Sequence, residues 1–426
     1  MNEPMPAAHG RTDVLAAPVM RELKQFSASK QEILTAAGMY LLAYLYLRIG
    51  YTWQLPVFTA GFILITELLS RNVTRSKENL FWLFCLILTA AARTLNRCTA
   101  WEDGGFLVLH AFAVWYVLSR EDLFVQGESS PMILQDALNG LILIPFGHFF
   151  LRIRTVWFGL TNLRKRREGN GRSWLWTAGT VLLAGCLFIL AVHLLIEADD
   201  GFAGLLSGVS RLFENWHFEL DPEWVLSLPV GAYLFGLIAG GMREDRDRLR
   251  ESAQRTMERV GKLRRVENRV WTILAVCFCL TYGVFFIVQF RYLFSAFVRE
   301  LPEGFIVSRY ARQGFFELCG VMGVNFLLLI LMEKMSLRPV REDRAALTVL
   351  LILLLESLLF AAVAASKLIL YIDCFGFTPR RLQSSWAVSV LAAGCVCMGR
   401  SKITGRGSFK IWLFYSAASA AALCLF

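Results

Sequence analysis

The sequence predicts an all-α fold, a polytopic transmembrane helix bundle of about eleven or twelve spans. Hydrophobic residues make up 56% of the 426 residues, charged residues only 18%, and the mean hydropathy is +0.50. A soluble domain carries about a quarter charged residues. The apolar runs, such as 180–195 and 347–355, are continuous and do not alternate with polar residues. Backbone polar groups in hydrocarbon must be paired within the protein, so such runs predict helices and not the strands of a barrel.

Twelve apolar segments are candidate membrane helices. In chain order they are 33–47, 55–69, 80–92, 106–118, 132–151, 174–196, 224–239, 270–290, 315–332, 345–363, 386–398 and 409–426. Crossing about 30 Å of hydrocarbon takes about 20 residues, so the short early segments are expected to extend into their flanking residues. We expect a single transmembrane domain at 32–426, preceded by a cytoplasmic N-terminal segment at 1–31.

The charges of the loops predict the sidedness of the protein, because Lys and Arg concentrate in cytoplasmic loops. Residues 152–172 hold seven basic residues and one acid, and residues 242–269 hold ten basic residues and six acids. Residues 197–223 hold one basic residue and seven acids. The first two loops are therefore predicted to be cytoplasmic and the third external. Later loops alternate: 291–314 outside, 333–344 inside, 367–385 outside and 400–410 inside.

One early segment must not cross, because twelve full crossings from a cytoplasmic N-terminus would place residues 152–172 outside. Segment 132–151 is the candidate for a re-entrant or interfacial helix, since Gln135, Asp136, Asn139 and His148 interrupt it. The protein is expected in the cell membrane as a multi-pass chain.

Several functional classes are disfavoured by the sequence. It contains no phosphate-binding P-loop motif, no nucleophile elbow and no H-E-x-x-H zinc motif. The pairs Cys277-x-Cys279 and Cys395-x-Cys397 lack further ligands at zinc spacing, so we expect no metal and no cofactor. The net charge of +10 fits cytoplasmic loops and anionic lipid, and no aromatic-interleaved basic domain predicts nucleic-acid binding.

Polar residues within the apolar segments or at their ends are the candidates for function. Ionisable groups at membrane depth are costly and usually face a protein interior or a water-filled cavity, although mutual pairing between helices is the simpler explanation for any one of them. The candidates are Glu67, Gln289, Glu317, Asn325, Glu356 and Lys367.

Two clusters of polar residues flank the predicted external ends of the later helices. In the first, Tyr310, Gln313 and Glu317 share one helix face beside Gly314, with Arg312 on an adjoining face. An arginine at that depth suits phosphate or carboxylate capture, or simply reaches lipid headgroups. In the second, Lys367 and Tyr371 lie one turn apart. The pair Thr378-Pro379 predicts the start of a new helix, whose first turn includes Arg381. A helix N-terminus favours the binding of anions.

These clusters also carry a family resemblance. The motifs are QFRYLF at 289–294, YARQGFFEL at 310–318 and YIDCFGFTPRR at 371–381. They resemble the signatures of a bacterial, uncharacterised family of polytopic membrane proteins, domain of unknown function 4173, which is related to domain 4153. The resemblance is strongest over 270–398, and Lys367 stands where that family has arginine. It implies a multi-span membrane protein and no established activity.

We therefore predict a ligand site in a cavity open to the outer leaflet. Its predicted residues are Asp199, Asp200, Gln289, Tyr310, Arg312, Glu317, Lys367, Tyr371, Thr378 and Arg381. The expected ligand is an anionic small molecule or a lipid headgroup, and the expected function is transport or lipid handling. In a proton- or ion-coupled carrier, Glu317 or Glu356 would be the titrating group.

Two other functions stay open. A membrane-embedded transferase acting on a lipid-linked substrate would use external acids, of which Glu102, Asp103, Asp199 and Asp200 are the best placed. A sensor or partner protein would contact another membrane protein through 242–269, where Leu249, Met257, Val260 and Leu263 could form an apolar stripe. A non-enzymatic role is favoured over an enzymatic one.

Overall fold

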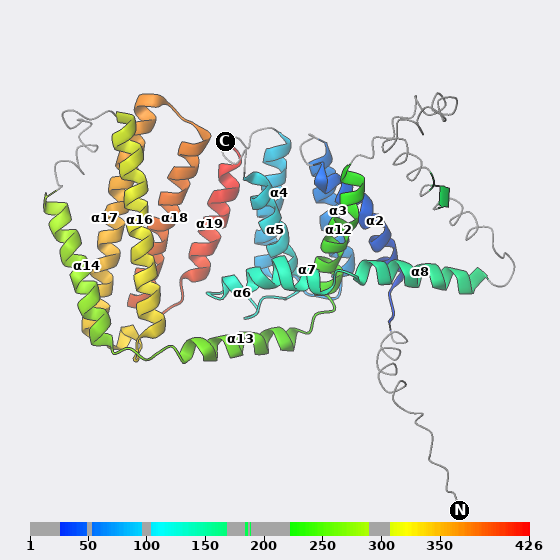
Figure 1. Cartoon of the computed structure of the whole chain (residues 1–426), viewed down its shortest axis with the longest axis horizontal. Helices are drawn as coiled ribbons and strands as arrows, with labels where there is room; N and C mark the ends of the chain where they lie inside the picture. The colour runs from blue at the N-terminus through cyan, green and yellow to red at the C-terminus, as the bar shows by residue number, and fades with distance from the viewer. Residues whose placement is uncertain are drawn as a thin grey trace, which may run out of the picture. The chain divides into compact units, whose positions relative to one another are not determined.

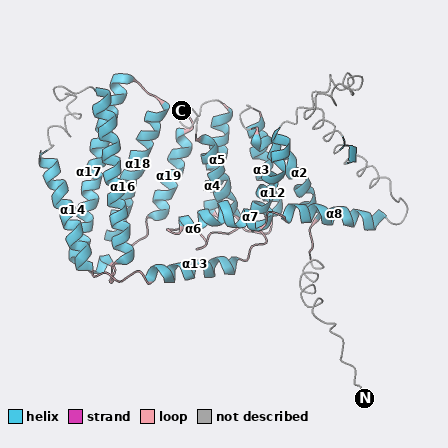
Figure 2. Ribbon diagram, in the orientation of Figure 1, coloured by secondary structure: helices cyan, strands magenta, loops and turns pink. Residues whose placement is uncertain are grey.

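The computed structural model describes residues 26–48, 53–95, 104–167, 184–185, 188, 222–288 and 307–426. Within these residues every regular element is a helix, and the only strand-like pairing is an isolated bridge between Val266 and Ser336 (Figures 1 and 2). The predicted all-α fold class is confirmed.

The chain divides into two compact units, Met1–Leu47 with Phe149–Gly236, and Arg48–His148 with Leu237–Phe426. The helices of the first unit are α2 (Lys30–Leu47), α8 (Leu151–Arg167) and α12 (Pro222–Phe235). The π-helix η3 (Gly236–Gly240) contains the boundary between the units. Those of the second are α3 (Gln54–Leu69), α4 (Lys77–Thr94), α5 (Gly105–Arg120), α6 (Ile133–Leu138), η2 (Asn139–Leu143), α7 (Ile144–Gly147), α13 (Arg246–Gly261), α14 (Asn268–Val288), α16 (Val307–Met335), η4 (Val340–Glu342), α17 (Arg344–Phe375), α18 (Pro379–Thr404) and α19 (Phe409–Leu423).

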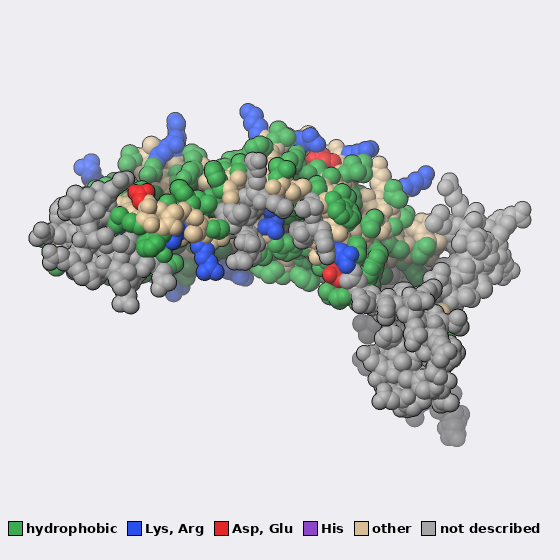
Figure 3. All heavy atoms as spheres, turned by 90° about the horizontal axis from the view of Figure 1, so that it is seen from above, with side chains coloured by type: hydrophobic (Ala, Val, Ile, Leu, Met, Phe, Trp, Pro, Cys, Tyr) green, Lys and Arg blue, Asp and Glu red, His purple; other side chains and the backbone are tan. Residues whose placement is uncertain are grey.

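Several helices are long and apolar enough to cross a membrane. In the described part of the chain six stretches meet both conditions, namely Ile133–Asn162, Pro222–Gly240, Asn268–Val288, Gly314–Met335, Arg344–Phe375 and Pro379–Thr404. Large hydrophobic side chains are exposed on them, including Ile287 at 78%. Helices of this length with exposed apolar side chains are stable in lipid, so the chain is a multi-pass membrane protein. Figure 3 looks onto one end of these helices, where Lys and Arg project singly among hydrophobic side chains. The count of eleven or twelve crossings stays a prediction.

In the first unit, α2 and α12 pack side by side and α8 runs across them (Figure 1). Arg152 on α8 fastens this unit, because its guanidinium donates to the carbonyl oxygens of Ala36 in α2 (3.0 Å) and Leu228 in α12 (3.4 Å). Trp224 stacks on Tyr44, with ring centroids 4.3 Å apart. The predicted basic loop 152–172 is therefore helical over the range of α8.

In the second unit, the segment predicted not to cross is interrupted. The stretch Ile133–Asn162 is long enough to span, but a turn at residues 148–150 breaks its helix. Before that turn, α6, η2 and α7 lie crosswise at one end of α4 and α5 (Figure 1). Asp136 is buried there and accepts a hydrogen bond from the Val125 N–H at 3.0 Å. That this segment does not cross the membrane stays a prediction.

The charged segment 242–269 forms helix α13, which begins after Asp245, whose carboxylate accepts the N–H groups of Asp247 and Arg248. One side of α13 packs on its own chain. Ala253 is buried, and Arg250 pairs with Asp122 at 3.2 Å. Of the predicted apolar stripe, Met257 and Leu263 remain about half exposed.

Glu121 is buried at the junction of α3, α5 and the start of α13. Its Oε1 accepts the Ser70 hydroxyl at 3.1 Å, and its backbone carbonyl accepts the Arg246 guanidinium. Burial raises the pKa of the Glu121 carboxyl well above its usual value, and outweighs the opposing effects of Ser70, Arg246 and Arg120. The folded state therefore holds a proton here that the unfolded state releases at lower pH.

This predicts a pH dependence of stability with a defined sign. Because the folded-state pKa lies above the unfolded one, the stabilisation is complete below the unfolded pKa and is lost as pH rises through the folded pKa. Glu121→Gln should remove this loss while keeping the Ser70 contact. Thermal unfolding in detergent across a pH series checks it, with Glu342→Gln, an exposed acid, as control. Parallel curves for wild type and Glu121→Gln would contradict the prediction.

The last five long helices form the part of the second unit that holds the site. In this bundle α17 is central and packs on α14, α16 and α18, and α18 packs on α19. Its core includes Met322 and Leu329 of α16 with Leu353 and Phe360 of α17, all fully buried. The residues just before α14 contact those just after α16, because the Leu337 N–H donates to the Val266 carbonyl oxygen at 2.8 Å. These contacts fix how α14, α16 and α17 face one another.

Candidate functional site

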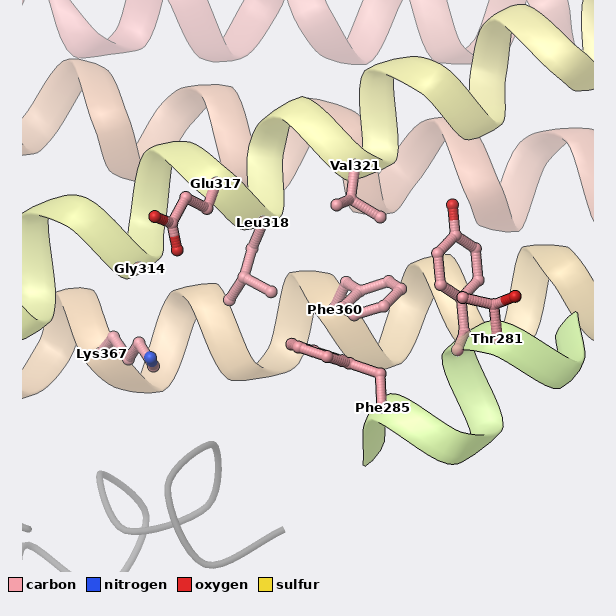
Figure 4. A pocket seen from close by; sticks show the side chains of 9 residues that line it. Thr281, Phe285, Gly314, Glu317, Leu318, Val321, Phe360 and Lys367 are labelled. Carbon is pink, nitrogen blue, oxygen red and sulfur yellow. The ribbon is translucent and has the colours of Figure 1, made fainter. Parts of the chain in front are cut away.

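A pocket of about 260 Å³ lies between α14, α16 and α17 (Figure 4). All three helices belong to the second unit. The lining residues are Thr281, Tyr282, Phe285, Gly314, Glu317, Leu318, Val321, Phe360 and Lys367. Two of these, Glu317 and Lys367, are ionisable residues that the sequence had selected.

One end of the pocket is charged. Lys367 of α17 is only 1% exposed, although it is a lysine within an apolar helix. It has room because Gly314 faces it: a Cβ at position 314 would lie 2.6 Å from the Lys367 Nζ. Glu317 of α16, one turn beyond Gly314, attracts the Lys367 ammonium electrostatically. Buried charges are tolerated when paired, so Glu317 offsets part of the cost of holding Lys367 there.

The rest of the pocket is apolar and largely aromatic. Phe360 is fully buried, and Tyr282 meets it edge-to-face with centroids 5.1 Å apart and planes at 88°. Phe285 from α14 lies beside Phe360, with their ring centroids 6.2 Å apart (Figure 4). Leu318 and Val321 complete the α16 side. The pocket is thus amphipathic, with a lysine at one end and hydrocarbon along its length.

A buried hydrogen-bond network fixes the apolar end. The Tyr282 hydroxyl donates to the Asn325 Oδ1 at 2.7 Å, and the Asn325 Nδ2 donates to the Ser357 Oγ at 2.9 Å. The Ser357 hydroxyl in turn donates to the Leu353 carbonyl oxygen. Asn325 is fully buried, so these bonds form in a medium of low polarity, where a satisfied network holds its members in one geometry. The network joins α14, α16 and α17 at this level.

The sequence pattern of a known family matches residues 80–426, and its description is "Domain of unknown function (DUF4153)". The match covers most of the chain. This chain belongs to the DUF4153 family. The pocket and all its lining residues lie within the matched DUF4153 region. No curated protein and no solved structure matches the chain.

The DUF4153 match extends well beyond 270–398, where the sequence resemblance was strongest. The sequence resemblance named domain 4153 as a relative of domain 4173, and domain 4153 is the family that the match shows. The closer resemblance to domain 4173 stays a prediction.

Of the predicted site residues, the structure brings Glu317 and Lys367 together in this pocket. Tyr371, Thr378 and Arg381 form a separate group at the end of α17. The Arg381 guanidinium lies 4.1 Å from the Tyr371 ring centroid and donates to the carbonyl oxygens of Phe375 and Gly376. Arg381 thereby closes the C-terminus of α17. Thr378 precedes Pro379 at the start of α18, as predicted, but its side chain makes no capping hydrogen bond.

The other predicted residues are not tested by the described part of the chain. Tyr310 and Arg312 belong to α16, but their side chains lie outside the described residues. Asp199, Asp200 and Gln289 also lie outside them, as do the transferase candidates Glu102 and Asp103.

Glu67, a candidate from the sequence, forms structural contacts. Its carboxylate pairs with Arg75 at 2.8 Å and Arg120 at 3.1 Å, and it accepts a hydrogen bond from the Tyr116 hydroxyl. In the described ranges no three His, Cys, Asp or Glu side chains converge on a point where a metal could bind.

The aromatic lining residues were not foreseen. Tyr282, Phe285 and Phe360 stand in apolar runs that resemble any membrane helix. The only sequence signal would have been Tyr282, since a tyrosine in mid-helix needs a hydrogen-bond partner, and Asn325 was already a candidate.

Proposed function

We propose that this protein is a transport-class or lipid-handling membrane protein whose pocket takes the anionic headgroup of an amphiphile. The observation that carries the proposal is the buried Lys367 at one end of an otherwise apolar pocket. A headgroup phosphate or carboxylate would pair with the Lys367 ammonium, in competition with Glu317. Charge-assisted hydrogen bonds of this kind are the strong ones in a medium of low polarity.

The size of the pocket supports a headgroup and not a whole lipid. Pockets that enclose drug-sized ligands measure about 300–1,000 Å³, and this one, at about 260 Å³, is smaller than that range. A headgroup and the first carbons of a chain would occupy it, with Phe285, Phe360 and Val321 along the carbons. The remaining hydrocarbon would stay in the bilayer.

The surroundings of the pocket support access from the bilayer. Helix α14 forms one wall of the pocket and exposes large apolar side chains, including Ile273 (65%), Leu280 (66%) and Ile287 (78%). Such a face is suited to lipid, so an amphiphile would meet the pocket without leaving the membrane. Lys367 lies near the C-terminal end of α17, the end predicted to be external.

Replacing Lys367 tests the proposal. Lys367→Met keeps an unbranched side chain and removes the charge, so we expect it to lower binding of phosphatidylglycerol about tenfold or more, the size of one charge-assisted hydrogen bond. Native mass spectrometry of the full chain in detergent measures the bound fraction. Diacylglycerol, which has no anionic group, should bind wild type and variant alike.

Lys334→Met provides a matched control, because Lys334 is an exposed lysine at the other end of α16. Competition by inorganic phosphate separates the two sources of the anionic group: displacement of the lipid indicates that a free anion also fits. Equal phosphatidylglycerol binding by wild type and Lys367→Met would overturn the proposal.

The transferase hypothesis gains no support here, because its acids lie outside the described residues. The partner-protein hypothesis rests on α13, which packs with one side on its own chain.

A further inference from the structure

Glu356 of α17 is an acid within a membrane helix that the pocket itself does not contain. It lies one turn before Phe360 and eleven residues, about three turns, before Lys367, so the three share one side of α17. In the described part of the chain its Oε2 is buried without a hydrogen-bond partner. Such an atom is costly to leave uncompensated and calls for an explanation.

The described groups that interact with Glu356 all come from α14. The Cys279 thiol lies beside the carboxyl group, and Tyr282 interacts with it electrostatically. Among the described residues of α16 and α18, no charged side chain interacts with it. A carboxyl group in this apolar setting carries a proton until water or a cation reaches it, because an isolated carboxylate is poorly tolerated in hydrocarbon.

Tyr282 links this carboxyl group to the pocket. Its ring lines the pocket against Phe360, and its hydroxyl donates to Asn325. Asn325 in turn bonds Ser357, the residue next to Glu356 on α17. A ligand that moves the Tyr282 ring must therefore alter the surroundings of Glu356.

We propose that Glu356 is a proton-binding site whose occupancy is coupled to the ligand pocket through Tyr282. The inference rests on the proposed function, because it takes the pocket to be the ligand site. The step is a simple proton transfer: when the pocket fills and Tyr282 shifts, the Glu356 carboxylic acid loses its proton to water, leaving a carboxylate and a hydronium ion. By linkage, protonation of Glu356 changes ligand affinity by the same factor as the ligand changes proton affinity.

The first experiment looks for the proton. Infrared difference spectra of the full chain, recorded on adding phosphatidylglycerol, should show loss of a protonated carboxylic acid band. Glu356→Gln should abolish that change. Glu342→Gln, an exposed acid preceding the same helix, should retain it. A wild-type spectrum without a carboxylic acid change, or one retained in Glu356→Gln, would overturn the proposal.

The second experiment measures the coupling between proton binding and lipid binding. It does not need the Glu356→Gln variant, so it remains informative if that variant does not fold. Phosphatidylglycerol affinity of wild type should change about fivefold or more between mildly acidic and neutral buffer, a usual size for coupled sites. Tyr282→Phe keeps the ring and loses the Asn325 contact, so its pH dependence should shrink. Glu317→Gln should keep the pH dependence, since Glu317 faces Lys367 and not Glu356.

The outcomes separate this inference from the proposed function. Lipid binding that needs Lys367 but does not vary with pH retains the function and rejects the proton site. A pH dependence that vanishes in Glu317→Gln but persists in Tyr282→Phe assigns the proton to Glu317 and also rejects it. Lipid binding that does not need Lys367 rejects the function itself.

Discussion

Replacing Gly314 with valine is expected to weaken phosphatidylglycerol binding about tenfold or more without unfolding the protein. A Cβ at this position would lie 2.6 Å from the Lys367 Nζ and 3.2 Å from its Cδ, so the lysine side chain must move out of its present place. The two additional methyl groups of valine would occupy the charged end of the pocket. We expect a loss of about tenfold or more, comparable to Lys367→Met, because the same charge-assisted contact is removed.

Gly320→Val is the matched control, six residues further along α16. A Cβ at Gly320 meets nothing within 4 Å, so valine should be accommodated there and binding should be unchanged. Both variants require measurement of lipid binding together with the thermal unfolding midpoint in detergent. If Gly314→Val bound the lipid as well as Gly320→Val, Lys367 would not contact the ligand from its present position.

The polar members of the site could be predicted from the sequence, because an ionisable residue in an apolar run is conspicuous. Glu317 and Lys367 were selected on that ground. Their proximity could not be predicted, since fifty residues separate them and it depends on Gly314 leaving space between two helices. The aromatic wall was missed for the opposite reason: Phe285 and Phe360 look like ordinary lipid-facing or packing residues.

The ends of the helices also show which features the sequence predicts and which it does not. The membrane span was predicted over 345–363, with Lys367 and Tyr371 one helical turn apart beyond it, and α17 does continue to Phe375. The burial of Lys367 against Gly314 was not predicted, because residues 367–385 were expected to form an external loop. The start of α18 was predicted correctly from Thr378-Pro379, where local backbone chemistry decides the structure. Features that depend on the local sequence, such as the start of α18, could therefore be predicted. Contacts between helices that are distant in the sequence could not.

Glu78→Ala is expected to destabilise the protein more than any variant of the pocket. Glu78 is 7% exposed in the first turn of α4 and holds three groups. Its Oε1 accepts the Trp82 Nε1–H at 3.3 Å and the Ser129 N–H at 3.1 Å. Its Oε2 pairs with the Lys410 Nζ of α19 at 2.7 Å. The carboxylate thus joins α4, the segment after α5 and α19.

Removing one partner of a buried ion pair costs about 3–5 kcal/mol. The lower part of that range applies, because Lys410 is about a third exposed and keeps a second partner, Glu128, at 2.6 Å. The N–H groups of Trp82 and Ser129 would lose their acceptor, which adds to the cost. We expect a decrease of about 3 kcal/mol in the free energy of unfolding, measured by denaturation in mixed micelles.

A graded series distinguishes the hydrogen bonds from the charge. Glu78→Gln retains an acceptor oxygen for Trp82 and Ser129 and loses only the attraction to Lys410, so it should destabilise less than Glu78→Ala. Glu128→Gln should cost least, because Glu128 is 64% exposed and an exposed ion pair is worth about 0–1 kcal/mol. If Glu128→Gln destabilised the protein as much as Glu78→Ala, the attachment of α19 would depend on the exposed acid, and the buried carboxylate of Glu78 would not be what holds the three segments together.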